Sequence, residues 1–161
     1  MLDPSGSMIT HLVTPSDYDR VTDLLNEFAY TLAPGLGPLN AGPFFASANN
    51  VGFRTPDHNG YVLFSHVGNH GDGAVYDGHL LCRPKSGAIA LGRAGVAMMF
   101  THWRASAIAA LIPKTNRASR IAFRAIGGTP IGESDDNLGR PCIAYMLERG
   151  PWEKSLVRSL A

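Results

Sequence analysis

The fold is decided by residues 107–128, AIAALIPKTNRASRIAFRAIGG. Residues 107–112 form a compact apolar run that predicts an interior strand, and Pro113 closes it because proline cannot donate to a sheet ladder. Residues 116–126 predict a helix with its arginines on the outer side. The pair Gly127-Gly128 then stops the helix, since glycine readily adopts the left-handed backbone of a helix end. We therefore expect a buried strand that leads directly into a helix.

Further elements extend on both sides of this stretch. Upstream, Thr14-Pro15-Ser16-Asp17 predicts a helix start, and apolar residues follow it at helical spacing. Residues 88–103 are apolar and rich in small side chains, which predicts a buried helix. Apolar runs bounded by turn residues predict strands at residues 9–13, 51–55, 61–67, 74–82, 130–133 and 142–148. The order predicts an α/β (α+β) fold in which a mixed sheet carries helices on both faces.

Two connections interrupt these elements. Residues 34–43, PGLGPLNAGP, are too rich in glycine and proline for regular structure and predict a mobile surface loop. Residues 68–73, GNHGDG, predict the turn of an antiparallel hairpin. Because His66 and His70 then flank a turn rather than share a helix face, we expect no metal site there.

The chain has 161 residues, of which 45% are apolar and 17% charged. This fits one domain with a real core and excludes disordered, fibrous and membrane-spanning classes. We expect a single domain at residues 8–150, a leader or expression remnant at residues 1–7 and a C-terminal tail at residues 151–161. The chain shows no signal-peptide pattern, and its two cysteines form no disulfide framework, so we expect a cytoplasmic protein.

Charge is divided unevenly along the chain. Residues 1–80 hold two basic and eight acidic residues, a net charge of −6, whereas residues 81–161 hold twelve basic and five acidic residues, a net charge of +7. Such asymmetry indicates that one half meets an anionic ligand or polymer. No acid lies between Asp77 and Glu133, where the bases are Arg83, Lys85, Arg93, Arg104, Lys114, Arg117, Arg120 and Arg124.

The stretch from Leu111 to Gly128 resembles a signature of the GCN5-related N-acetyltransferase (GNAT) superfamily. That signature has a strand followed by Asn. Counted from this Asn, a small residue stands three positions later, Tyr seven positions later, and Gly-Phe eleven and twelve positions later. The corresponding residues here are Asn116, Ser119, Phe123, Gly127 and Gly128, so Tyr has become Phe and the final Phe has become Gly. With the element order and the opening residues 8–25, the resemblance covers most of residues 8–148. It implies a mixed, mostly antiparallel sheet of six to seven strands, splayed between strands 4 and 5 to admit acetyl-coenzyme A.

The resemblance also implies where the coenzyme binds. A helix start holds a pyrophosphate because its free N–H groups and its dipole favour negative charge. In the GNAT superfamily, a loop with small residues at this helix start binds the pyrophosphate, and two alignments of the chain with that loop are possible. The first register uses residues 83–88 and puts Lys85 beside the phosphate, although Pro84 lacks an N–H. The second register puts Ala90 and Gly92 in the positions of the small residues. The coenzyme-binding residues expected with the first register are Leu81, Cys82, Lys85, Ser86, Gly87, Ala88, Asn116, Ser119, Arg120 and Phe123.

Two of these features have structural interpretations as well. Asn116 suits a hydrogen bond to the pantetheine arm and equally suits a helix N-cap, and the two roles are compatible. Arg117, Arg120 and Arg124 recur at helical spacing, so they share a face that either meets phosphates or is simply solvated.

Acetyl transfer to an amine needs a neutral nucleophile, a stabilised oxyanion and a proton for the departing thiolate. The resemblance implies that a backbone N–H near residues 80–82 binds the oxyanion and that a tyrosine gives the proton. Phe123 has no hydroxyl, so water, another group such as Tyr145, or no group takes that role. Asp77 and His79 lie two apart on the expected fourth strand, which fits either a catalytic base or a solvated polar pair.

Three classes of function follow. The first is an acetyl-coenzyme A-dependent N-acetyltransferase acting on a small-molecule or protein amine, with the acidic half facing a cationic acceptor. The second is a catalytically weak or inactive GNAT-like binding or structural module, one version being a bacteriophage protein associated with the virion or its assembly; its partners would be a second copy or a virion component. The third is nucleic-acid binding, which the net charge of +1 and the scarcity of interleaved aromatics disfavour.

Overall fold

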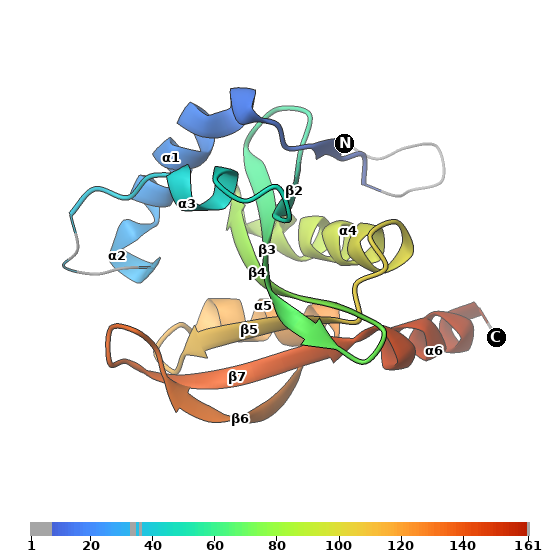
Figure 1. The fold of residues 1–161 in the computed structure, drawn as a ribbon. Helices are drawn as coiled ribbons and strands as arrows, with labels where there is room; N and C mark the ends of the chain where they lie inside the picture. Colours follow the sequence, from blue (N-terminus) through green and yellow to red (C-terminus); the bar gives the residue numbers. More distant parts are fainter. Residues whose placement is uncertain (1–7, 33–34, 36, 161) are drawn as a thin grey trace. The chain divides into compact units, whose positions relative to one another are not determined.

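A computed structural model describes residues 8–32, 35 and 37–160. Within them, seven strands form one sheet in the order β1-β2-β3-β4-β5-β7-β6 (Figure 1). The strands are β1 His11–Leu12, β2 Val51–Arg54, β3 Gly60–His70, β4 Gly73–Cys82, β5 Ala107–Pro113, β6 Thr129–Asp135 and β7 Pro141–Glu148. The helices are α1 Tyr18–Glu27, α2 Ala29–Leu32, α3 Gly42–Phe45, α4 Ala88–Thr101, α5 Arg117–Ile126 and α6 Arg149–Leu160, with short 3-10 helices η1 Pro15–Asp17 and η2 Lys85–Gly87.

The sheet is mixed because β4 and β5 run parallel. Their register extends from the pair Val75–Ala107 to the pair Asp77–Ala109. The β1–β2, β2–β3, β5–β7 and β6–β7 pairs are antiparallel. A mostly antiparallel sheet of seven strands, with only a short parallel ladder between its fourth and fifth strands, confirms the expected fold class and is consistent with a splay at that point.

The described residues divide into two compact units. Unit 1 contains the residues up to Ser65 together with His79–Gly95, and unit 2 contains His66–Gly78 together with the residues from Val96 onward. β3, β4 and α4 each run from one unit into the other, so neither unit is a continuous segment of the chain.

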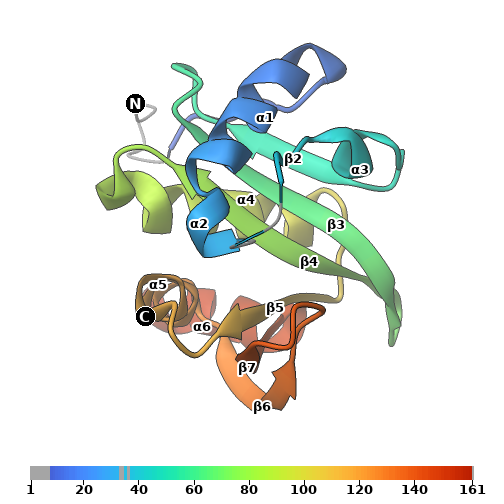
Figure 2. The same cartoon turned by 90° about the vertical axis from the view of Figure 1, so that its left-hand side faces the viewer.

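In unit 1, α1 packs on one face of β3 and β4. The helix begins as the sequence predicts, because the Asp17 carboxylate accepts a hydrogen bond from the Thr14 N–H at 2.9 Å and Pro15 lies in the first turn. Figure 2 shows α1 and α2 in front of these strands. The buried cluster beneath α1 consists of Val21, Leu24, Ala41, Tyr61, Leu63 and Leu81.

The first half of α4 covers the opposite face of the strands in unit 1. Glycine permits a close approach there, since a Cβ at Gly95 would lie 2.6 Å from Val62 Cγ1 and 3.1 Å from Phe64 Cε2. Gly60 likewise leaves room for Leu91, which is fully buried. Residues 88–101 of the apolar stretch 88–103, which predicted a buried helix, therefore do form a helix that packs against the sheet.

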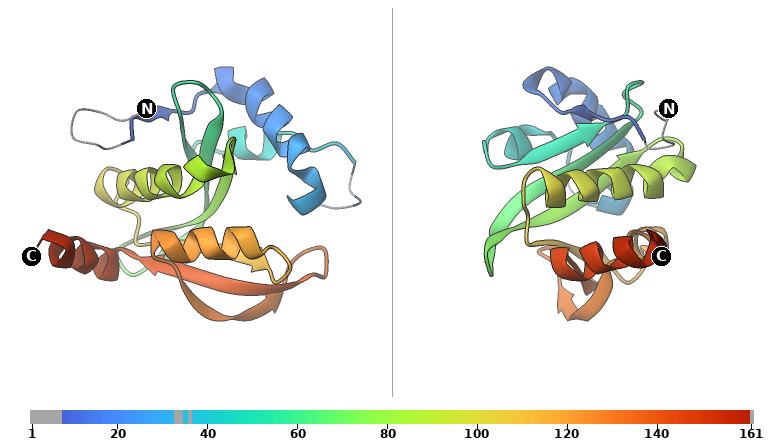
Figure 3. Two further views of the ribbon diagram at one scale, coloured as in Figure 1. Left: turned by 180° about the vertical axis from the view of Figure 1, so that it is seen from behind. Right: turned by 90° about the vertical axis from the view of Figure 1, so that its right-hand side faces the viewer.

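In unit 2, α5 lies along β5 and β7 (Figure 3). The helix ends at Gly127, whose φ of 120° is the left-handed conformation expected of a helix-stopping glycine. After β7 the chain continues into α6, and the ring of Trp152 packs 5.1 Å from the ring of Phe100. This contact anchors a helix that propensity alone would leave marginal.

Arg149, at the start of α6, joins three segments of unit 2. Its guanidinium donates to both carboxylate oxygens of Asp72 at 2.9 Å, and to the carbonyls of Arg104 at 2.8 Å and Ala105 at 3.2 Å. The β3–β4 hairpin, the segment before β5 and the end of β7 are thereby tied together.

The structure differs from the sequence predictions most clearly in three places. β3 continues to His70, so the turn is only Gly71-Asp72, because a two-residue turn with a left-handed glycine matches the twist of a hairpin. α3 begins inside the predicted loop, and Arg149–Leu160 is a helix where a C-terminal tail was expected at residues 151–161. The predicted leader at residues 1–7, and Pro34 and Leu36 of the predicted loop, lie outside the described residues. In the described part of the chain, no helix has the length and apolar character to cross a membrane.

Candidate functional site

In unit 1, β4 ends in a buried pair of residues that the sequence placed in the coenzyme site. Leu81 is 1% and Cys82 is 8% exposed. Burial raises the pKa of the Cys82 thiol above its usual value of 9.0. The chain that follows is fixed to the β2–β3 turn, because the Arg83 N–H donates to the Asn59 carbonyl at 2.8 Å.

The backbone amides that follow Pro84 fall into two groups. The Gly87 N–H donates to the Pro84 carbonyl at 3.1 Å, and the Ala88 N–H donates to the Lys85 carbonyl. The N–H groups of Lys85 and Ser86 have no acceptor among the described residues, and both side chains are exposed. These two amides are the donors available to an anion at this helix start.

The second register of the pyrophosphate loop falls in a different setting. Ala90 lies in the first turn of α4, whereas Gly92 lies inside the helix, where each N–H is used for the carbonyl four residues earlier. The small side chain of Gly92 therefore does not coincide with a free backbone donor.

Arg83, the first residue of the first register, has a partner that the sequence did not reveal. It forms an ion pair with Glu27 at the end of α1. Their side chains are 48% and 43% exposed, so the pair adds little stability. It does hold the guanidinium toward α1.

In unit 2, the start of α5 confirms the N-cap interpretation of Asn116. Its side-chain oxygen accepts a hydrogen bond from the Ser119 N–H at 3.2 Å. The three arginines of this helix are not equally solvated: Arg117 and Arg124 are exposed, whereas Arg120 is half-buried. The Nε of Arg120 is buried and has no hydrogen-bond partner among the described residues.

Phe123 is buried in unit 2 and makes two close contacts. Its ring packs on the ring of Tyr145 with centroids 5.9 Å apart and planes at 73°. A Cβ added at Gly128 would lie 2.2 Å from Phe123 Cδ1 and 2.3 Å from Cε1. The ring thus occupies the space that any side chain at position 128 would need.

Tyr145, on β7 beneath α5, is completely buried. Its hydroxyl has no hydrogen-bond partner among the described residues. The guanidinium carbon of Arg124 lies 6.0 Å from the centre of its ring. Phe123, Arg124 and Tyr145 therefore lie next to one another in unit 2.

The two polar residues of the fourth strand lie where the sequence put them. Asp77 and His79 are both on β4, and their spacing places them on the same face of the strand. Asp77 is half-buried and belongs to unit 2, whereas His79 is exposed and belongs to unit 1.

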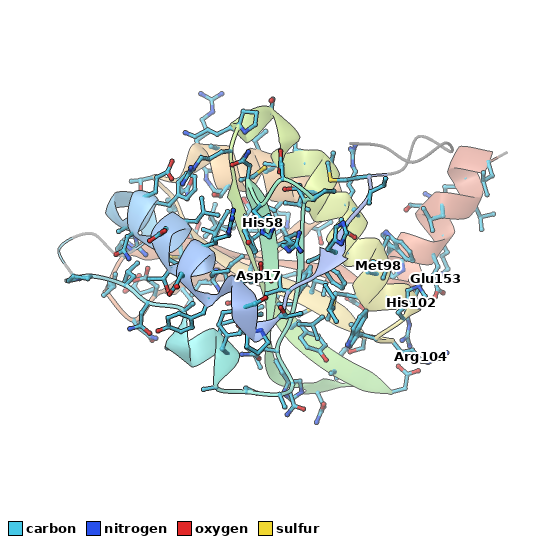
Figure 4. All side chains as sticks on the ribbon, turned by 90° about the horizontal axis from the view of Figure 1, so that it is seen from above. Asp17, His58, Met98, His102, Arg104 and Glu153 are labelled. Atoms are coloured by element: carbon cyan, nitrogen blue, oxygen red, sulfur yellow. The ribbon has the colours of Figure 1, made fainter. Side chains whose placement is uncertain are left out.

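A buried polar cluster in unit 1 was missed by the sequence analysis. Asp17, expected only as an acid of a helix start, is 3% exposed and accepts a hydrogen bond from the Tyr61 hydroxyl at 3.0 Å. Its Oδ1 also lies 3.3 Å from Arg54 Nε and 3.4 Å from His58 Nδ1. Asp17 and His58 are labelled in Figure 4. Burial, with the bond to Asp17, raises the pKa of Tyr61. No local pattern links residues that are up to 44 positions apart.

Several solved acetyltransferase structures match nearly the whole chain. The aminoglycoside acetyltransferase AAC(6')-Ib in complex with coenzyme A and kanamycin matches with a TM-score of 0.69 and 17% identity, covering 92% of this chain and 98% of its own. A GNAT-family acetyltransferase from Bacillus anthracis matches with a TM-score of 0.66 and 14% identity, over 89% of this chain and 97% of its own. A spermidine N-acetyltransferase SpeG chimera from Vibrio cholerae and hSSAT matches with a TM-score of 0.71 and 12% identity, over 89% and 96%. The chain has the GNAT fold.

No protein-family model matches the sequence, and no curated protein sequence does either. At identities of 11–18% among the matched structures, the GNAT fold is carried by the pattern of elements rather than by shared residues. The expected site residues of this chain fall into two groups. Unit 1 holds residues 81–88, and unit 2 holds Asn116, Ser119, Arg120, Phe123 and Tyr145.

Proposed function

We propose that the protein transfers the acetyl group of acetyl-coenzyme A to an amine. The observation that supports this most directly is the start of α4 within a GNAT fold. There the backbone N–H groups of Lys85 and Ser86 have no acceptor in the described part of the chain, and the Lys85 side chain is exposed. Free amides and a cation at a helix start suit a pyrophosphate. A matched structure, that of AAC(6')-Ib, contains coenzyme A.

In unit 1, Lys85, Ser86, Gly87 and Ala88 would hold the pyrophosphate, in the first of the two registers, and the backbone of residues 80–82 would bind the thioester oxygen. In unit 2, the side-chain NH2 group of Asn116, whose oxygen makes the helix cap, would bind the pantetheine arm together with Ser119. Arg120 would offer its unpartnered Nε to an anionic or carbonyl oxygen.

The acceptor must reach the thioester as a neutral amine, so a base is needed. Asp77 and His79 on β4 are the groups we assign to that task, directly or through water. A cationic acceptor fits the exposed acids Asp19 and Asp23 of α1 in unit 1. Kanamycin, present in one matched structure, and spermidine, named in another, are polyamines of this kind.

Binding of the coenzyme is tested by calorimetric titration with acetyl-coenzyme A and with coenzyme A. We expect dissociation constants in the micromolar range, and a flat titration with both would refute the proposal. Transfer is then tested by the thiol released from acetyl-coenzyme A in the presence of kanamycin, spermidine or an alanine-terminated peptide.

Arg120→Ala tests the placement of the coenzyme on α5. Loss of a charge-assisted hydrogen bond is worth about 1.5–3 kcal/mol, so we expect affinity to fall by roughly one to two orders of magnitude. Arg158→Ala, on exposed α6, is the control that removes the same charge elsewhere in the chain. Equal affinities for the two variants would place the phosphates away from Arg120.

One observation favours a second candidate, a GNAT-fold binding or assembly module. Phe123 replaces the expected tyrosine, and it is buried in packing contacts with Gly128 and Tyr145. A protein that binds coenzyme A tightly but releases no thiol with any of the amines would fit this candidate, with a second copy or a virion component as its partner.

A further inference from the structure

The buried Asp17 cluster of unit 1 joins four segments of the chain. Asp17 Oδ2 accepts a hydrogen bond from the Thr14 N–H ahead of α1, and Oδ1 accepts from the Tyr61 hydroxyl of β3. Oδ1 also lies 3.3 Å from Arg54 Nε of β2 and 3.4 Å from His58 Nδ1 of the β2–β3 turn. Since Asp17 is only 3% exposed, its carboxylate depends on these groups and fixes them relative to one another.

His58 contributes a hydrogen-bond donor to this cluster. The Tyr61 hydroxyl has a single proton, which it donates to Asp17, so its oxygen can only accept from His58 Nδ1 at 3.1 Å. Nδ1 therefore carries a proton, and this N–H faces two oxygen atoms, those of the Tyr61 hydroxyl and of Asp17 Oδ1. His58 thus ties the β2–β3 turn to the buried carboxylate.

The β2–β3 turn is stiff because it is bonded internally. Asp57 Oδ1 accepts hydrogen bonds from the Thr55 hydroxyl at 2.6 Å and from the Asn59 N–H at 3.0 Å. The Thr55 N–H donates to the Gly60 carbonyl at 2.9 Å. His58 has a φ of 61°, a left-handed conformation that a residue with a side chain keeps only where its surroundings hold it. Because the turn is stiff, the His58 ring sets the position of the turn as a whole.

The turn holds the start of the loop to which we assign the pyrophosphate. The Asn59 carbonyl accepts a hydrogen bond from the Arg83 N–H at 2.8 Å. Shortly after Arg83 come the amides of residues 85–86, which have no acceptor in the part of the chain that the structure describes. The Arg83 side chain pairs with Glu27 of α1, the helix that begins directly after Asp17. Both the backbone and the side chain of Arg83 are therefore bound to elements that Asp17 joins.

We propose that Asp17 and His58 are positioning residues for coenzyme binding, which act through Asn59 and Arg83. This inference rests on the proposed function. Asp17 and His58 do not touch the coenzyme; they hold the turn, and the turn holds the two free amides of residues 85–86 in place. A loop that is already fixed loses less conformational entropy when it binds an anion. Loss of the His58 contact therefore weakens the binding of the pyrophosphate and leaves the chemical step unchanged.

His58→Asn tests this role, because asparagine tolerates the left-handed backbone but has no imidazole to donate to Tyr61 and Asp17. We expect the calorimetric dissociation constant for coenzyme A to rise about ten-fold, the KM for acetyl-coenzyme A to rise by a similar factor and kcat to stay the same. In the wild type without coenzyme, the Arg83 amide should exchange with deuterium slowly and the amides of residues 85–86 fast. In the variant, the Arg83 amide should exchange faster.

Two controls distinguish positioning from a general loosening of the fold. S-acetylpantetheine has the same thioester as acetyl-coenzyme A but no pyrophosphate, so its kcat/KM should be equal in His58→Asn and in the wild type. Arg104→Asn replaces the other described non-glycine residue with a positive φ, in unit 2, and should leave coenzyme affinity unchanged. If urea denaturation shows that His58→Asn is partly unfolded, His58→Gly repeats the test, because glycine adopts this backbone without strain.

The outcomes separate this inference from the function on which it rests. A wild type that binds no coenzyme A refutes the proposed transfer and this inference with it. A wild type that binds coenzyme A, with His58 variants of equal affinity, refutes the inference alone. The inference also fails if the Arg83 amide exchanges no faster in the variants, if S-acetylpantetheine and acetyl-coenzyme A lose activity equally, or if both variants unfold. Each of these results would mean that His58 stabilises the fold without positioning the loop.

Discussion

Phe123 and Gly128 depart from the GNAT signature at two separate positions of the sequence, and in space the two residues are in contact. The ring of Phe123 fills the volume next to the Gly128 Cα, where the signature has a large side chain. The chain thus has one aromatic ring where the signature has two, and the hydroxyl of the signature tyrosine is absent.

Gly128→Ala tests this packing at a single residue. A Cβ at 128 would lie 2.2 Å from Phe123 Cδ1, so the ring must shift, and we expect a loss of about 1–3 kcal/mol in the free energy of unfolding. Gly132→Ala is the control, since no atom lies within 4 Å of its added Cβ, and it should be neutral or slightly stabilising. Urea denaturation of both variants measures the difference. Similar stabilities for the two variants would show that the Phe123 ring is free to move.

Only some features of single residues could be predicted from sequence. The capping role of Asn116 depends on residues three positions away, and the structure confirms it. The unpartnered hydroxyl of Tyr145 and the burial of Asp17 depend on contacts with distant segments, which no local pattern reveals. Tyr145 was considered because it is an aromatic group with a hydroxyl, not because the sequence indicated that it would be buried.

At the scale of elements, the strands and long helices were predicted because each has its own periodicity and its own stop signals. The Asn116-to-Gly127 helix and the apolar α4 are examples. The errors occur where tertiary contacts decide. α6 is a helix because Trp152 packs on Phe100 and Arg149 binds Asp72, and both partners are far away in sequence.

Arg149 gives a prediction about these elements. Arg149→Lys removes the planar guanidinium, which donates to two carbonyls and a carboxylate at once. We expect the free energy of unfolding to fall by about 1–2 kcal/mol. Asp72→Asn should cost less, about 0–1 kcal/mol, because the Asp72 side chain is 77% exposed. Urea denaturation distinguishes the two. If both variants lose the same free energy, the ion pair and not the carbonyl bonds stabilises the junction.

At the scale of the whole molecule, the charge asymmetry of the sequence does not survive folding. The described residues of unit 1 carry five basic and five acidic side chains, and those of unit 2 carry nine and seven. The −6 and +7 halves mix because β3, β4 and α4 take part in both units. Basic side chains are still concentrated at the start of α4 and along α5. The anionic ligand inferred from the sequence would therefore meet two short basic segments and not a basic half of the chain.

Stability should decline in alkali, because the folded chain holds several acidic groups in their neutral form. Burial raises the pKa of Cys82 and Cys142 above the usual 9.0, and that of Tyr61 above the usual 10.0. Each raised pKa stabilises the fold fully below the usual value, and this contribution is lost as the pH rises through the folded value. We expect the urea midpoint to fall from about pH 9 upward.

Tyr61→Phe measures how much of the alkaline fall in stability comes from the Tyr61 hydroxyl. The variant loses the bond to Asp17 at neutral pH, and its stability should change less than that of the wild type above pH 10. Tyr18→Phe, at a partly exposed ring, controls for the removal of a phenol. A wild-type midpoint that stays flat to pH 10.5 would mean that the buried thiols and Tyr61 ionise freely in the folded protein.

The passage of β3 and β4 through both units has a consequence for the order in which the protein forms on the ribosome. All of unit 1 has been synthesised once Gly95 is made, whereas unit 2 lacks β5, β6, β7 and both of its later helices at that moment. The outer part of β4, with Val75 and Tyr76, must then wait as an open strand edge until its parallel partner Ala107–Ala109 emerges. We expect the nascent chain to expose this edge until residues 107–109 have been made, and chaperones to contact it during that interval.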